Sequence, residues 1–152
     1  MIRAAASVVI ERPIDEVFAF MADFENDRRW RSDVVEIARV SGDVAGPGAR
    51  YHQVVRPGSR PVELDFETSD VDPGRRLRFR STSGPAHVEG AYTFEPAGAG
   101  TRVAFLSEIR PRGILRLAEQ SLGRAIQGGS EVDLRRLKAV LESRGVRRRG
   151  GA

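Results

Sequence analysis

The chain has 152 residues, with 25 basic and 21 acidic side chains and a net charge of +4. It contains no cysteine, which excludes disulfides, thiolate metal sites and a cysteine nucleophile. Its arginines are spread along the chain among the acids, which argues against a nucleic-acid partner. No apolar run approaches the roughly 20 residues that cross a bilayer, so we expect one cytoplasmic domain without a membrane span.

The chain begins with a predicted strand, because Ala6, Val8 and Ile10 alternate with the residues between them. A helix is predicted to follow, and Pro13 fits its first position, where the missing N–H costs nothing. One apolar face then recurs at helical spacing, through Ile14, Val17, Phe18 and Met21. Asp23 is placed to cap a second short helix that runs into Trp30.

From Val34 onward the apolar period changes from 3.6 to 2, which predicts strands. Six alternating segments follow, separated by turns rich in glycine and proline, at residues 34–40, 50–56, 62–67, 76–80, 87–94 and 103–109. In the hairpin of the third and fourth segments, an acidic row is predicted to lie opposite a basic row on the solvent face. These rows are Glu63, Asp65 and Glu67 on one strand and Arg76, Arg78 and Arg80 on the other.

The last predicted element is a long amphipathic helix, which follows helical spacing from Leu115 to about Ser143. Gly128 and Gly129 interrupt it, which indicates a kink or the close approach of a strand or a ligand. We therefore expect a single domain over residues 1–144 and a basic, disordered tail over residues 145–152.

Several segments resemble one known family. They are residues 7–18 (Ser-Val-Val-Ile-Glu-Arg-Pro-Ile-Asp-Glu-Val-Phe), Trp30, residues 48–51 (Gly-Ala-Arg-Tyr), residues 92–96 (Tyr-Thr-Phe-Glu-Pro) and residues 100–103 (Gly-Thr-Arg-Val). In them the chain resembles the START-like or SRPBCC superfamily, the Bet v 1-like helix-grip fold, and within it the polyketide cyclase/dehydrase branch. The resemblance covers the chain to Ser143. It rests on strand, turn and core positions, so it is specific for fold rather than for function.

The resemblance implies an α+β helix-grip fold, in which a seven-stranded antiparallel sheet curves around the long C-terminal helix and leaves a ligand cavity. Members of the superfamily include carriers of lipids, hormones and quinones, aromatase/cyclases, and dioxygenase subunits with an iron site of two histidines and a carboxylate. Here His52 and His87 both fall on the polar side of their strands. We therefore expect neither a metal site nor a cofactor.

The candidate binding residues lie on the inward rows of the strands and on the apolar face of the long helix. They are Tyr51, Gln53, Phe66, Phe79, Tyr92, Phe105, Leu122 and Ile126. Aromatic residues in these rows could equally fill a solid core. Gln53 and Tyr92 favour a cavity, since a buried amide or phenol needs a hydrogen-bond partner. Trp30 is predicted to lie in the core.

The sequence is compatible with three functions. The first is a carrier or sensor of a small hydrophobic molecule, such as a lipid, a polyketide or a quinone-like compound. The second is a polyketide cyclase or dehydrase, in which Tyr51, Tyr92 or Gln53 moves protons or holds an enolate oxygen. The third is an interaction module with a closed core. No catalytic motif is present and the pattern places no charged side chain inside, which favours binding.

Overall fold

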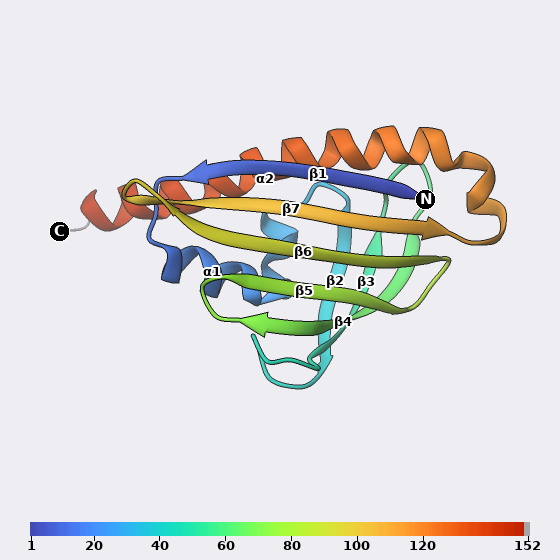
Figure 1. Ribbon diagram of the computed structural model, residues 1–152, viewed down its shortest axis with the longest axis horizontal. Coiled ribbons are helices and arrows are strands. Elements are labelled where there is room, and N and C mark those ends of the chain that lie inside the picture. The colour runs from blue at the N-terminus through green and yellow to red at the C-terminus, as the bar shows by residue number, and fades with distance from the viewer. Residues whose placement is uncertain (151–152) are drawn as a thin grey trace.

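The computed structural model describes the backbone of residues 1–150 and the side chains of residues 1–144. Seven strands form one antiparallel sheet in the order β1-β7-β6-β5-β4-β3-β2. They are β1 (Ile2–Ile10), β2 (Val34–Ser41), β3 (Arg50–Val55), β4 (Val62–Asp72), β5 (Arg76–Ser83), β6 (Ala86–Ala97) and β7 (Gly100–Pro111). In Figure 1 the strands β2 and β3 run across β5, β6 and β7, so the sheet is strongly curved. The predicted α+β helix-grip fold is confirmed.

A long helix, α2 (Glu119–Gly150), follows β7 and runs along β1 (Figure 1). Leu134, Leu137 and Leu141 lie at helical spacing on one face of α2 and are buried. The first turns predicted for this helix are instead a 3-10 helix, η2 (Gly113–Ala118), which leads from the sheet into α2. The predicted tail, residues 145–152, lies outside the residues whose side chains are described.

Two short helices, α1 (Ile14–Ala22) and the 3-10 helix η1 (Phe24–Arg29), join β1 to β2 as predicted. Pro13 is the residue before α1 rather than its first residue, because its ψ of 146° is extended. The Asp23 carboxylate caps η1 by accepting a hydrogen bond of 3.1 Å from the Glu25 N–H. These helices place the buried Phe18 and Phe24 against the concave side of the sheet.

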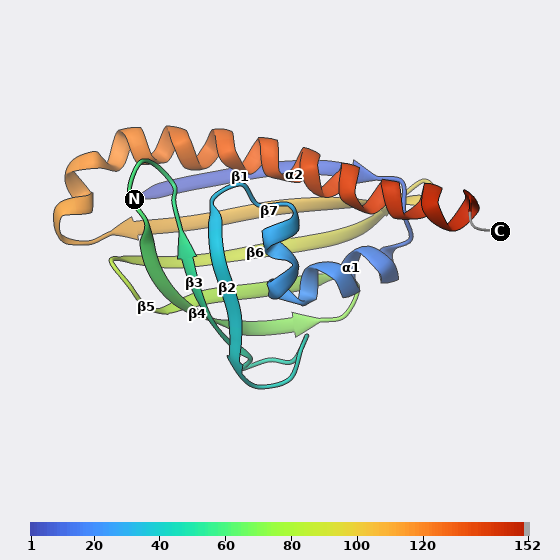
Figure 2. The same ribbon diagram turned by 180° about the vertical axis from the view of Figure 1, so that it is seen from behind.

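The filled part of the core lies under α1, η1 and the C-terminal half of α2. Phe18 meets Phe94 edge to face at 5.1 Å between ring centroids. Phe24 meets both Tyr51 and Phe66 in the same way, at 5.3 and 5.2 Å. Figure 2 shows α1 at the same end of the molecule as the C-terminal half of α2. At the opposite end of the sheet, near Met1, the cross-strand neighbours are Ile2, Ile109 and Val88 instead.

The predicted rows of charge are only partly correct. Glu67 lies opposite Arg80 and forms an ion pair with it at 2.6 Å. Arg76, however, pairs with Asp70 at 2.7 Å, while Asp65 contacts His52. The cause is the position of the hairpin turn, which aligns Asp72 with Arg76 and Asp70 with Arg78. A register shift between Thr68 and Asp70 then brings Glu67 opposite Arg80, and alternation alone does not reveal it.

None of the helices in the described part of the chain combines the length and the hydrophobicity of a membrane-spanning helix.

Candidate functional site

A cavity of about 580 Å³ lies between the concave side of the sheet and the N-terminal half of α2. Seven of the eight predicted binding residues line it: Gln53, Phe66, Phe79, Tyr92, Phe105, Leu122 and Ile126. Strands β3 to β7 supply the first five and α2 supplies the last two. A volume of this size suits a small organic molecule.

Tyr51 does not line the cavity, contrary to the prediction. Its side chain is fully buried, and its ring stacks on Phe66 at 5.1 Å between centroids. Phe24 and Phe66 both line the cavity, so Tyr51 packs behind them in the filled core. Burial raises the pKa of Tyr51.

The wall formed by the sheet is aromatic. Tyr92 lies between two rings, with centroid distances of 5.7 Å to Phe79 and 5.2 Å to Phe105. Phe79 on β5 pairs with Gly90 on β6, and a Cβ at position 90 would lie 2.3 Å from the Phe79 ring. Gly90 therefore provides the space in which the ring lies across the sheet.

One side of the cavity is polar. We call it the polar corner and define it as Trp30, Arg31 and Asp33 after η1, Gln53 on β3 and Asp133 on α2, all of which line the cavity. The Arg31 guanidinium donates to Asp33 Oδ2 at 3.0 Å and to the buried Asp27 Oδ2 at 3.2 Å.

Asp133 ties α2 to the segment between η1 and β2. The N–H and the hydroxyl of Ser32 donate to Asp133 Oδ1, at 3.0 and 2.8 Å. Asp133 is 7% exposed. Burial raises its pKa, although these hydrogen bonds act in the opposite direction.

The prediction that no charged side chain lies inside is therefore wrong. Arg31 and Asp33 were missed because they lie in a connection between elements, where alternation carries no information. Asp133 did carry a signal, because it lies seven residues after Ile126 and so shares the face of α2 that points to the sheet.

Three polar atoms of the polar corner are buried without a hydrogen-bond partner within the described residues. They are Trp30 Nε1, Asp33 Oδ1 and Gln53 Oε1. Trp30 and Gln53 are only 2% and 5% exposed. Unpaired buried polar atoms are destabilising, so these three atoms are available for hydrogen bonds with a molecule in the cavity.

The glycine pair of α2 does not break the helix, which runs on through both residues. Gly129 lines the cavity, whereas Gly128 is exposed. A Cβ built on either one meets no heavy atom within 4 Å. Of the three predicted reasons for the glycines, a kink, a strand or a ligand, the close approach of a strand does not apply within the described residues. Space for a ligand is present at Gly129 only.

The two histidines lie outside the cavity, on the polar side of the sheet. His52 Nδ1 contacts Asp65 Oδ1 at 2.5 Å, and this hydrogen bond raises the pKa of His52. His87 lies near Glu89 at 3.3 Å. In the part of the chain with described side chains, no three His, Cys, Asp or Glu residues gather as metal ligands would.

The sequence of residues 1–142 matches the family described as polyketide cyclase/dehydrase and lipid transport. The chain belongs to this family. No curated protein has a significantly similar sequence.

Solved structures share the fold of this family member. A protein from Thermus thermophilus is 24% identical, with a TM-score of 0.80, and the match covers 93% of this chain and 98% of the other. The Zhui aromatase/cyclase from Streptomyces sp. R1128 is 16% identical, with a TM-score of 0.82 and coverage of 93% and 94%. A START superfamily protein from Mycobacterium smegmatis is 11% identical, with a TM-score of 0.80 and coverage of 94% and 99%.

In this polyketide cyclase/dehydrase family member, Asp27 lies behind the polar corner, in contact with Arg31. Its carboxyl group has the most strongly shifted pKa of the described carboxyl groups. Burial raises the pKa of Asp27 from 3.8 to about 7, although Arg31 acts in the opposite direction. Burial also raises the pKa of Tyr92, and the nearby Asp27 adds to this shift. Arg31 stays charged, because Asp33 and Asp27 raise its pKa despite burial, which lowers it.

This shift predicts a pH dependence of stability. At pH values between about 4 and about 7 the native Asp27 holds a proton that the unfolded chain has lost, so its contribution to stability falls as the pH rises. Asp27→Asn cannot titrate. The melting temperature of the wild type should therefore fall relative to that of Asp27→Asn across this range, measured by circular dichroism. Parallel curves for the two proteins would contradict the assignment.

Proposed function

We propose that the protein binds a small, mostly apolar molecule that carries a neutral hydrogen-bonding group, held in the cavity between the sheet and α2. The observation that carries this proposal is an aromatic and apolar cavity of about 580 Å³ with three unpartnered polar atoms on one side. The family description, which includes lipid transport, agrees with such a role. The cavity is also inconsistent with the closed core that an interaction module would need.

The polar corner restricts the kind of ligand. Asp33 Oδ1 and Gln53 Oε1 accept hydrogen bonds, whereas Trp30 Nε1 donates one. A plain alkyl chain would leave all three atoms unpaired, and a quinone, which only accepts, would leave the two oxygens unpaired. An anionic head group would meet the Asp33 and Asp133 carboxyls, and the Arg31 guanidinium is already paired with Asp33 and Asp27. A hydroxylated aromatic compound of the polyketide type fits better, because its hydroxyls both donate and accept.

Three naphthalenes of similar shape test this proposal. Isothermal titration should show that 2,3-dihydroxynaphthalene binds at least about 10-fold more tightly than 2,3-dimethylnaphthalene, since one good hydrogen bond is worth about this factor. The dimethoxy analogue, which accepts but does not donate, should resemble the dimethyl compound. If none of the three binds or raises the melting temperature, the cavity is not a binding site.

Substitution of Gln53 tests whether the polar corner causes the preference for 2,3-dihydroxynaphthalene over the dimethyl compound. Gln53→Leu keeps the size of the side chain and removes its polar atoms, so the preference for the diol over the dimethyl compound should shrink. Gln120→Leu makes the same change on an exposed residue of α2 that does not line this cavity, and it should leave the preference intact. An unchanged preference in Gln53→Leu would contradict the assigned role.

A second candidate function, catalysis of polyketide cyclisation or dehydration in the same cavity, is favoured by one observation. The cavity is lined by the ionisable groups Arg31, Asp33 and Asp133 as well as Tyr92. Tyr92 would stay protonated near neutral pH, because its pKa is raised, so it would donate a hydrogen bond to an enolate oxygen rather than act as a base. The raised pKa of Asp133 would suit it to hold a proton.

A further inference from the structure

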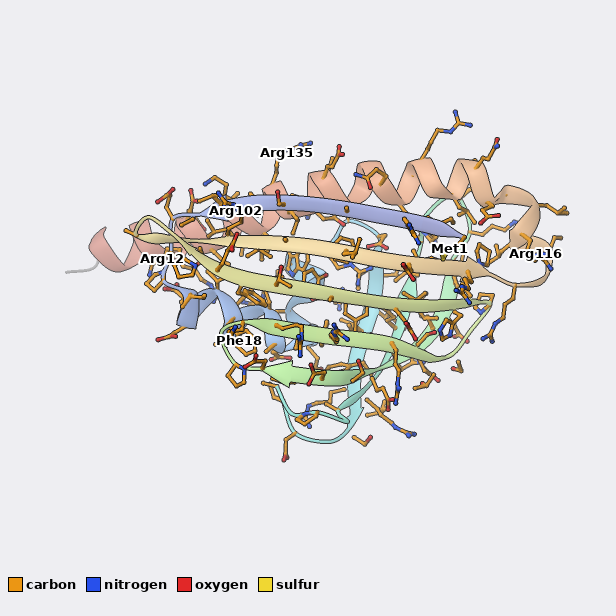
Figure 3. The ribbon with its side chains drawn as sticks, viewed as in Figure 1. Met1, Arg12, Phe18, Arg102, Arg116 and Arg135 are labelled. Atoms are coloured by element: carbon orange, nitrogen blue, oxygen red, sulfur yellow. The ribbon has the colours of Figure 1, made fainter. Side chains whose placement is uncertain are left out.

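The cavity opens between two segments whose lining residues are largely exposed. One is the β3–β4 turn, which lines the cavity from Arg56 to Arg60. The other runs from the end of β7 through η2 to the first turn of α2, and it contributes Pro111, Leu115, Ala118 and Ser121. Figures 1 and 2 both show these segments at the end of the molecule where Met1 lies, and Figure 3 places Arg116 at this end too. We call this region the mouth.

The short helix η2 at the mouth has two apolar sides. Leu115 and Ala118 line the cavity. Ile114 and Leu117 are 80% and 89% exposed, more than any other large hydrophobic side chain with a described position. Residues three apart eclipse one another in a 3-10 helix, so each pair forms a small apolar patch, one turned to the cavity and one to solvent.

The mouth is also positively charged. Arg56, Arg60, Arg112 and Arg116 are exposed, and over residues 1–144 no carboxylate forms an ion pair with any of them.

Two acidic side chains at this end of the molecule are already paired with other cations. Glu119 contacts the ammonium group of Met1, and Glu108 lies 3.5 Å from Arg3. The two exposed apolar side chains of η2 are flanked along the chain by Arg112 and Arg116, while Arg56 and Arg60 lie in the other segment of the mouth.

We propose that the mouth docks on the surface of a bilayer that contains anionic lipid, with Ile114 and Leu117 inserted among the lipids and the four arginines bound to phosphates. Guanidinium groups match phosphates geometrically, and a few apolar anchors with a basic rim are what an interfacial membrane site needs. Two apolar side chains and four arginines fall far short of the roughly 20 to 30 residues per side of a stable protein interface. Docking would place the mouth of the cavity against the lipid phase, in which apolar ligands dissolve.

Sedimentation with vesicles tests this proposal on the full chain. The wild type should sediment with vesicles of phosphatidylcholine and phosphatidylglycerol and much less with phosphatidylcholine alone. The double variant Ile114→Ser/Leu117→Ser should lose at least about 10-fold in affinity. Arg112→Gln/Arg116→Gln should lose most of the dependence on phosphatidylglycerol.

Val40→Ser/Leu106→Ser is the matched control, because these side chains are 64% and 55% exposed but lie on β2 and β7, away from η2. It should bind vesicles as the wild type does. The sequence carries three further arginines at 147–149. If those alone drove association, Ile114→Ser/Leu117→Ser would bind normally, and that result would overturn the proposal, as would a wild type that ignores anionic vesicles.

The proposal can fail without the ligand-binding function failing. Ile114 and Leu117 do not line the cavity, so their serine variant should bind 2,3-dihydroxynaphthalene in solution with unchanged affinity and melt at the wild-type temperature. Normal binding of the diol with no vesicle binding in the wild type would reject the membrane site and keep the cavity.

Discussion

Replacing Gly129 with leucine should lower the affinity for 2,3-dihydroxynaphthalene by at least about 100-fold, measured by isothermal titration. Gly129 lines the cavity and no heavy atom lies within 4 Å of a Cβ at this position, so the new side chain would extend into the space that the ligand needs. The protein itself should not lose stability, because leucine is favoured over glycine in a helix interior by up to about 1 kcal/mol.

Gly128→Leu is the control for this experiment. It has the same effect on helix propensity, but Gly128 is exposed and does not line the cavity. We expect normal affinity for the diol and a similar gain in melting temperature. If both variants bind the diol normally, the ligand does not occupy the space beside α2.

The second large effect is on stability and separates the filled core from the cavity wall. Phe94→Ala should cost about 3–5 kcal/mol, because Phe94 is 5% exposed and packs edge to face on Phe18. Phe79→Ala should cost less than half as much, because one side of its ring already faces the cavity. Only Phe79→Ala should alter ligand affinity.

Denaturant unfolding measures both losses, and titration of the diol measures the affinities. Equal destabilisation by Phe94→Ala and Phe79→Ala, with unaltered binding in both, would mean that the cavity wall behaves as ordinary core. That result would count against the proposed function and in favour of a core that closes in solution.

Most of the fold could be predicted from the sequence because it depends on periodicity. The change from a period of 3.6 to a period of 2 after Trp30 distinguishes the short helices from the strands. Register could be predicted only near the turn, where counting places Asp72 and Asp70 opposite Arg76 and Arg78. The shift that brings Glu67 opposite Arg80 does not change the alternation of β4, so the sequence does not show it. Local propensity also did not show that Gly113–Ala118 forms a 3-10 helix.

The site was less predictable for a physical reason. Strand alternation identifies which face a residue is on but not how far along the sheet the filling ends. Tyr51 and Gln53 share a face of β3, yet the former lies behind Phe24 and the latter beside the cavity. The charged residues of the polar corner come from a connection and from one position of α2. Their grouping exists only once the chain has folded.

The two halves of α2 differ in what holds them to the sheet. From Asp133 onward, buried leucines and the two hydrogen bonds from Ser32 attach the helix to the rest of the protein. Before that point Leu122 and Ile126 face a cavity, and Gln127 bonds to the backbone of Ala5. Local opening therefore costs less free energy in the first half of the helix than in the second. A bound molecule would take the place of the missing hydrophobic core there, so ligand binding and the local order of this helix would be one coupled equilibrium.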